Sequence, residues 1–149
     1  MSQLSTFHVG KYLFGVDVSL VQEVVRLQQM TPVPLASAEI AGLINLRGEV
    51  LTAIDLRARL GLPPSDGDRE PVNVVVRVDD EPVSLLVDEI GGVLEVSQVP
   101  FEQTPSTVDE RVRDLLLGAY TLPERLLLAL NARRVLDAGP AGATESRAA

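Results

Sequence analysis

Few residues of this chain have the types and spacing that catalysis requires. His8 is the only histidine and there is no cysteine, so a metal site of imidazole and thiolate ligands lacks its members. A serine or threonine nucleophile would have only His8 as its base, and His8 has no nearby sequence partner of the triad kind. Three acids crowd together at 79–81, but the pattern around them predicts a hairpin tip, where acids are ordinary solvated turn residues. Gly91 and Gly92 lack the G-x-G-x-x-G spacing of a nucleotide-binding loop and are predicted to form a turn. The sequence therefore predicts a protein that is not an enzyme and that uses no metal or cofactor.

The composition narrows the class of partner. A net charge of −8, without a stripe of lysine and arginine, argues against nucleic acid. Hydrophobic residues make up 46% of the chain and aromatic residues only 3%, so we expect an aliphatic core, which favours strands. No apolar run approaches the roughly 18 residues that cross a bilayer, and the N-terminus has no signal-peptide pattern. We expect a cytoplasmic protein without direct membrane insertion.

The elements that must position any binding residues begin with a predicted hairpin. Apolar and polar residues alternate over 6–9 and again over 12–16, with a Gly-Lys turn between them. Asp17 is then expected to cap a short helix. Four valines would share one face of this helix: Val18, Val21, Val24 and Val25. The prolines in 31–34 end the pattern.

A second hairpin is predicted over residues 42–54, turning at Arg47 and Gly48. Asp55 follows as the N-cap of a short helix that carries two arginines and stops at Gly61. The polar, turn-rich stretch 64–70 would connect the two halves of the chain.

The second half of the chain repeats the plan of the first. Residues 72–78 and 83–87 alternate like the first hairpin, and residues 126–136 repeat the strand and capped helix of 50–60. Each half spans roughly 70 residues, with an insertion in 101–113, which indicates a duplication. Two repeats of short strands predict two small β-barrels side by side. A partner is expected in the groove between them.

The predicted domain covers residues 1–138. Its two lobes would span about 15–70 and 71–138, and the N-terminal strands would contribute to the barrels. Residues 139–149 are small and polar, so we expect a disordered tail.

Four stretches together carry a resemblance to a known family: 21–24 (Val-Gln-Glu-Val), 32–34 (Pro-Val-Pro), 42–48 (Gly-Leu-Ile-Asn-Leu-Arg-Gly) and 54–57 (Ile-Asp-Leu-Arg). In order and spacing the chain resembles the CheW family of bacterial chemotaxis adaptors, from about Thr6 to Asp137. The resemblance implies a mostly β fold of two intertwined, five-stranded, SH3-like barrels with short connecting helices. It also implies a function without catalysis, in which the adaptor couples the cytoplasmic tips of chemoreceptors to the regulatory domain of a CheA-type histidine kinase in membrane-associated arrays.

The resemblance also implies which residues bind partners. Glu23 and Arg47 match the family's acidic residue and hairpin arginine, which implies that they pair at the receptor and kinase surfaces. Asn45 and Gly48 belong to the same Asn-Leu-Arg-Gly motif and complete this part of the expected set. The alternative for Arg47 is a turn residue that points into water.

Val18 and Val21 match apolar positions that would line a groove for the apolar face of a receptor helix. The alternative is that both valines belong to the ordinary core. Three other functions stay open at this point: a competitor that occupies only the kinase, an adaptor of a system that controls pili or development, and a small hydrolase or isomerase. The last would have to use scattered residues such as His8, Asp88 and Glu89.

Overall fold

The computed structural model describes residues 3–26, 29–64 and 70–137. Its strands are β1 (Gln3–Val9), β2 (Tyr12–Asp17), β3 (Val21–Val25), β4 (Met30–Thr31), β5 (Ile40–Leu46), β6 (Glu49–Asp55), β7 (Val72–Val78), β8 (Glu81–Val87), β9 (Glu89–Glu95), β10 (Phe101–Glu102), β11 (Leu116–Thr121) and β12 (Leu126–Leu130). The helices are short: η1 (Val18–Leu20, a 3-10 turn), α1 (Leu56–Arg59), α2 (Glu110–Arg113) and α3 (Ala132–Leu136). The predicted tail at 139–149 and most of the predicted connection at 64–70 lie outside the described residues.

The strands form two six-stranded sheets. The first sheet has the order β3-β7-β8-β6-β5-β4 and the second has the order β10-β11-β12-β2-β1-β9. Adding six to the labels of β3, β4, β5 and β6, and replacing β7-β8 by β1-β2, turns the first order into the second order read in reverse. The duplication predicted from the sequence is therefore present in the topology, and the mostly β prediction is confirmed. Each sheet gains a sixth strand beyond the expected five if the two-residue strands β4 and β10 are counted.

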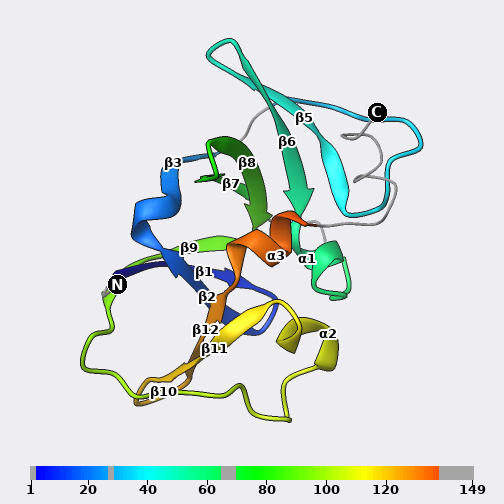
Figure 1. The fold of residues 1–149 in the computed structure, drawn as a ribbon. Coiled ribbons are helices and arrows are strands. Elements are labelled where there is room, and N and C mark those ends of the chain that lie inside the picture. Colours follow the sequence, from blue (N-terminus) through cyan, green and yellow to red (C-terminus); the bar gives the residue numbers. More distant parts are fainter. Residues whose placement is uncertain (1–2, 27–28, 65–69, 138–149) are drawn as a thin grey trace.

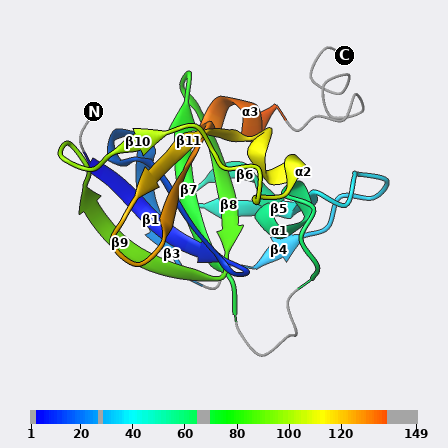
Figure 2. The ribbon, with the colours of Figure 1, turned by 90° about the horizontal axis from the view of Figure 1, so that it is seen from below.

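Each sheet takes its hairpin from the opposite half of the chain. The β1–β2 hairpin joins the strands of the second half through the parallel pair β2–β12, and β7–β8 joins those of the first half through the parallel pair β6–β8. Figure 1 shows the two sheets one above the other, and Figure 2 shows them from below. In both views α1, α2 and α3 gather on one side of the molecule. Cutting the chain near residue 70 would therefore divide the strands of each sheet between the two fragments.

The core that holds the sheets together is aliphatic. One large cluster takes residues from both sheets and from all three helices, including Phe14, Val74, Leu56, Val112 and Val135, each at most 1% exposed. Such a core is stabilised by removing apolar surface from water, which is a strong but non-directional effect. None of the described helices is long and apolar enough to span a membrane.

The predicted helix after Asp17 is wrong beyond its first turn. Asp17 does cap a turn, since its Oδ1 accepts a hydrogen bond from the backbone N–H of Ser19 at 3.0 Å, but this 3-10 turn ends at Leu20. Val21–Val25 continue as β3, antiparallel to β7. The β-branched valines fit a pleated strand better than a helix, so pairing with β7 overrides the helical spacing.

The predicted turn at Gly91 and Gly92 is also wrong. Both glycines lie inside β9, where Thr6 pairs with Gly92 and Phe7 with Ile90, so Gly91 is the extra residue of a β-bulge. A Cβ at Gly91 would lie 2.5 Å from Thr6 Oγ1, which itself donates to the Gly92 carbonyl at 2.7 Å. Glycine is required here by the close approach of β1.

Candidate protein-binding surface

The ion pair between Glu23 and Arg47 joins two elements that are 24 residues apart in sequence. Glu23 lies on β3, and Arg47 lies at the tip of the β5–β6 hairpin, where its Nη2 donates to Glu23 Oε2. The Arg47 side chain is 66% exposed and that of Glu23 is 23% exposed. Opposite charges at the surface thus present a fixed pattern of donors and acceptors to a partner without being buried.

The hairpin turn itself is built by the rest of the motif. Arg47 and Gly48 both have positive φ, at 53° and 89°, as a tight two-residue hairpin requires. The Gly48 backbone N–H donates to Asn45 Oδ1 at 2.9 Å, which ties the turn to the strand before it. Asn45 and Gly48 therefore hold the backbone that presents Arg47.

A second set of polar contacts, missed by the sequence reasoning, lies around Arg77 on β7. Its Nε donates to Gln22 Oε1 at 2.9 Å, its Nη1 donates to the Asp80 carbonyl at 2.9 Å, and its Nη2 lies 3.6 Å from Glu49 Oε1. Glu49 follows the hairpin turn directly, and Gln22 precedes Glu23. The exposed surface around the β5–β6 tip therefore carries more alternating charge than the motif indicates. The β3–β7 register shift next to Gln22 gives no signal in the sequence.

The two valines of the predicted site lie at the edge of the core. Val18, in η1, is half-buried, and Val21 packs against the large cluster from a half-buried position. The valines of the same region that project most into solvent are different ones, Val24 on β3 at 41% exposed and Val50 on β6 at 60%. Apolar surface for a partner is thus present beside the ion pair, but the two predicted valines supply only part of it.

A hollow of about 280 Å³ lies elsewhere, against the second sheet. Phe101, at 50% exposed, and Leu117, at 63%, line it together with Tyr120, whose ring centroid lies 4.7 Å from that of Phe101. None of the six predicted binding residues lines this hollow. The molecule therefore has two distinct surfaces that combine exposed apolar side chains with charge.

Asp79 is an exposed turn residue, as the sequence predicted, and it also forms an ion pair that the sequence did not indicate. It sits at the β7–β8 turn with φ of 53°, and its carboxylate accepts hydrogen bonds from Arg133 on α3. This hydrogen bonding, together with the charge of Arg133, lowers the pKa of Asp79 below its ordinary value. The pair joins a turn of the first sheet to a helix that follows the second.

The candidate catalytic residues lie on neighbouring strands: His8 of β1 pairs with Glu89 of β9, and the His8 carbonyl accepts a hydrogen bond from the backbone N–H of Asp88 at 3.0 Å. His8 is half-buried on β1, and no group of three or more His, Cys, Asp or Glu is placed to hold a metal ion among the residues that the structure describes. Asp88 instead accepts two hydrogen bonds from Arg57, at 3.0 and 2.7 Å, and one from the Gly10 backbone N–H at 2.8 Å. It serves to join α1 to the β1–β2 turn.

Comparison with known proteins identifies the family. The family model described as the CheW-like domain matches residues 3–139. The chemotaxis protein CheW of Rhizobium meliloti is 34% identical over 125 residues, which span 84% of this chain and 81% of the relative. This chain belongs to the CheW family. The probable chemotaxis protein CheW of Rhizobium etli is likewise 32% identical over 147 residues, spanning 99% of this chain and 92% of the relative.

The fold agrees with a solved CheW structure. The scaffolding protein TtCheW from Thermoanaerobacter tengcongensis matches with a TM-score of 0.77 and 24% identity over 87% of this chain and 88% of that one. The paired sheets described above are consistent with SH3-like subdomains. As a CheW-family protein, this chain is a non-catalytic adaptor of chemotaxis signalling, so the hydrolase alternative is excluded.

Proposed function

We propose that this adaptor joins the cytoplasmic tip of a chemoreceptor to the regulatory domain of a CheA-type histidine kinase, and that it works in the cytoplasm at membrane-associated receptor arrays. The observation that carries the proposal is the exposed Glu23–Arg47 pair at the tip of the β5–β6 hairpin. An exposed ion pair contributes only about 0.2 to 1 kcal/mol to stability. Its value is therefore greater in recognition than in folding.

The size of the molecule allows two partners at once. Its accessible surface is 8480 Å², and a standard interface covers about 800 Å² on each partner. Two such interfaces would occupy about a fifth of that surface. The β5–β6 tip and the hollow beside Phe101 are separate enough in composition and position to serve different proteins.

The binding residues we propose are Glu23 and Arg47 as polar contacts, Asn45 and Gly48 as the residues that set the turn, and Val18 and Val21 as part of the apolar surface. Exposed valines on the strands around the charged pair, Val24 on β3 and Val50 on β6, suit an amphipathic helix, which supplies apolar side chains at helical spacing. The cytoplasmic tip of a chemoreceptor would present such a helix if it is a helical hairpin.

Kinase activity tests the proposal. Receptor tip fragments and kinase are mixed with increasing amounts of the adaptor, and autophosphorylation of the kinase is followed. We expect kinase activity to rise only when all three proteins are present. A fall in activity would identify a competitor that occupies the kinase alone, and no change at micromolar adaptor would refute the proposal.

A further inference from the structure

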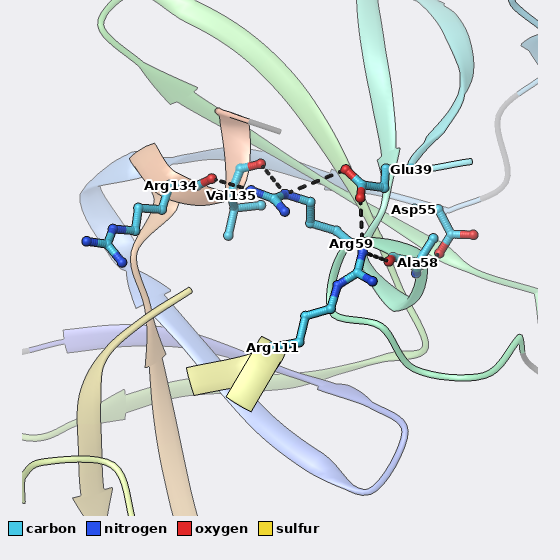
Figure 3. A network of polar contacts seen from close by, with 7 residues as sticks. All are labelled: Glu39, Asp55, Ala58, Arg59, Arg111, Arg134 and Val135. Carbon is cyan, nitrogen blue, oxygen red and sulfur yellow. Dashed lines mark hydrogen bonds and ion pairs between the residues drawn. The ribbon is translucent and has the colours of Figure 1, made fainter. Parts of the chain in front are cut away.

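A polar network joins the helices where the two halves of the chain meet. Figure 3 shows the guanidinium of Arg59, at the end of α1, directed at the C-terminal turn of α3. Its Nε donates to the Val135 carbonyl at 3.2 Å and its Nη2 to the Arg134 carbonyl at 2.9 Å. A cation is favoured at a helix C-terminus, because the last carbonyls have no partner within the helix. Arg59 thus ties the helix that follows the first sheet to the helix that follows the second.

Glu39 lies between two arginines in this network. Its Oε1 is 3.9 Å from Arg59 Nε, and its Oε2 accepts a hydrogen bond from Arg111 Nη2 at 3.0 Å. The same Arg111 nitrogen also donates to the Ala58 carbonyl of α1 at 3.2 Å. The Glu39 side chain is only 14% exposed, and its buried Oε1 accepts no hydrogen bond from the described residues. The carboxylate therefore depends on the two guanidinium groups to balance its charge.

The duplicated fold shows which residue occupies the position of Glu39 in the second half of the chain. The Glu39 carbonyl accepts a hydrogen bond from the backbone N–H of Asp55 at 2.8 Å, and the Leu115 carbonyl accepts one from that of Asn131, also at 2.8 Å. Asp55 and Asn131 are the equivalent N-caps of α1 and α3. Glu39 and Leu115 are thus equivalent, and Leu115 is 5% exposed. A site that takes a core leucine in one half holds a carboxylate in the other, although a poorly solvated charge is costly unless it is paired.

Arg111 comes from the segment that the sequence marks as an insertion in the second half. It lies on α2, and its aliphatic stem packs over Gly61, just beyond α1. A Cβ at Gly61 would lie 2.7 Å from Arg111 Cδ, and Gly61 has a φ of +76°. The inserted helix is therefore fitted closely to the end of α1, which fixes the direction from which Arg111 reaches Glu39.

The network supplies directional contacts that the aliphatic core lacks. Valine and leucine packing resists separation of the sheets, but it tolerates small shifts better than hydrogen bonds do. Buried polar contacts are retained in some proteins because they select one arrangement among several of similar packing energy. Here the carboxylate and the two arginines join α1 and the turn before β5, in the first half, to α2 and α3 of the second.

We propose that Glu39 is a positioning residue, which acts through Arg59 and Arg111 to fix the orientation of one sheet relative to the other. This inference rests on the proposed bridging function for its biological meaning, because the angle between the sheets sets the angle between the two bound partners. Loss of the carboxylate should leave the chain folded and broaden the distribution of angles.

Distances between spin labels on the two sheets test this directly. The chain has no cysteine, so a pair of introduced cysteines is labelled without background. Val50→Cys on β6 and Val93→Cys on β9 are suitable, since these side chains are 60% and 53% exposed. The parent should give one narrow distance distribution, and Glu39→Leu, which copies the equivalent Leu115, should broaden or shift it. Glu23→Leu is the matched control, because its ion pair joins two elements of the same sheet, and it should leave the distribution unchanged.

Arg111→Ala provides a second variant at a side chain that is 55% exposed, so that a folding defect of Glu39→Leu would not decide the outcome. It should broaden the distribution as Glu39→Leu does, while circular dichroism stays that of the parent. Unchanged distributions in both variants would overturn the proposal, as would equal broadening in Glu23→Leu. The measurement needs no partner, so its failure is distinct from a failure of the proposed function.

Discussion

At the scale of single residues, the exposed charges of this adaptor are arranged for recognition more than for stability. Arg47 is two-thirds exposed and is held at a hairpin tip by a positive-φ turn. Its partner Glu23 lies on another strand, so the pair forms only when the first sheet is correctly assembled. An interaction of this kind is weak in water but becomes selective when a partner covers it.

Reversing one charge of the pair should separate stability from binding. We expect Arg47→Glu to change the free energy of unfolding by less than about 1 kcal/mol, because an exposed pair contributes no more than this. The same change should abolish binding of the partner that contacts the β5–β6 tip. Thermal denaturation and a pull-down measure the two effects. The double variant Glu23→Lys with Arg47→Glu should keep the parent stability, and a large loss of stability in the single variant would show instead that Arg47 is structural.

The Asp79–Arg133 pair makes a prediction about pH. Arg133 lowers the pKa of Asp79 below its ordinary value of 3.8. A group whose pKa is lower in the folded state contributes stability above its unfolded pKa, and this contribution is lost as the pH falls through the folded value. In Arg133→Ala the pKa of Asp79 should rise toward 3.8, as followed by NMR titration of its carboxyl carbon. Arg125→Ala, which removes a donor to the Lys11 carbonyl, should leave that pKa unchanged.

At the scale of elements, the sequence predicts best those turns and helix ends that depend on residues close together in the chain. The hairpin turn at Arg47 and Gly48 and the N-caps at Asp55 and Asn131 are all present. The helix expected after Asp17 fails because Val21, Val24 and Val25 also fit a strand, and β7 offers the pairing partner. The bulge at Gly91 depends on β1, which lies more than eighty residues earlier in the chain. Local sequence patterns cannot predict contacts between residues that are far apart in the chain.

The three short helices allow a controlled test of capping. Asp55 Oδ1 accepts from the Ala58 backbone N–H at 3.3 Å and Asn131 Oδ1 from that of Arg134 at 3.1 Å, whereas Asp109 makes no such bond at the start of α2. Asp55→Ala and Asn131→Ala should each lower the free energy of unfolding by about 0.5 to 2 kcal/mol. Urea denaturation measures the loss. Asp109→Ala should cost clearly less, and an equal cost at all three positions would contradict the capping argument.

At the scale of the whole molecule, the exchange of hairpins makes the two sheets depend on each other. The largest cluster of buried side chains draws on both sheets, so neither can be completed by its own half of the chain. The motif residues could be selected from the sequence by resemblance, and the structure brings Glu23 and Arg47 together as that resemblance implies. The contacts of Arg77 and the Glu39 network could not be selected, because both depend on how strands or helices from different halves of the chain pack together.

Dividing the chain at residue 70 should therefore abolish folding of both parts. Fragments 1–70 and 71–149 should each lack a cooperative thermal transition, since each would carry a hairpin without its sheet. Mixed in equal amounts they should recover the circular dichroism of the parent, because every strand pair can then form. Independent cooperative folding of either fragment would contradict the exchanged topology.

In the proposed function, one adaptor chain holds two proteins at the same time. The most direct measurement is a pull-down in which an immobilised receptor tip fragment captures the kinase regulatory domain, with and without the adaptor. We expect the kinase domain to be retained only when the adaptor is present, and to be lost with Arg47→Glu. Capture of either protein by the adaptor alone, but never of both together, would contradict the bridging function.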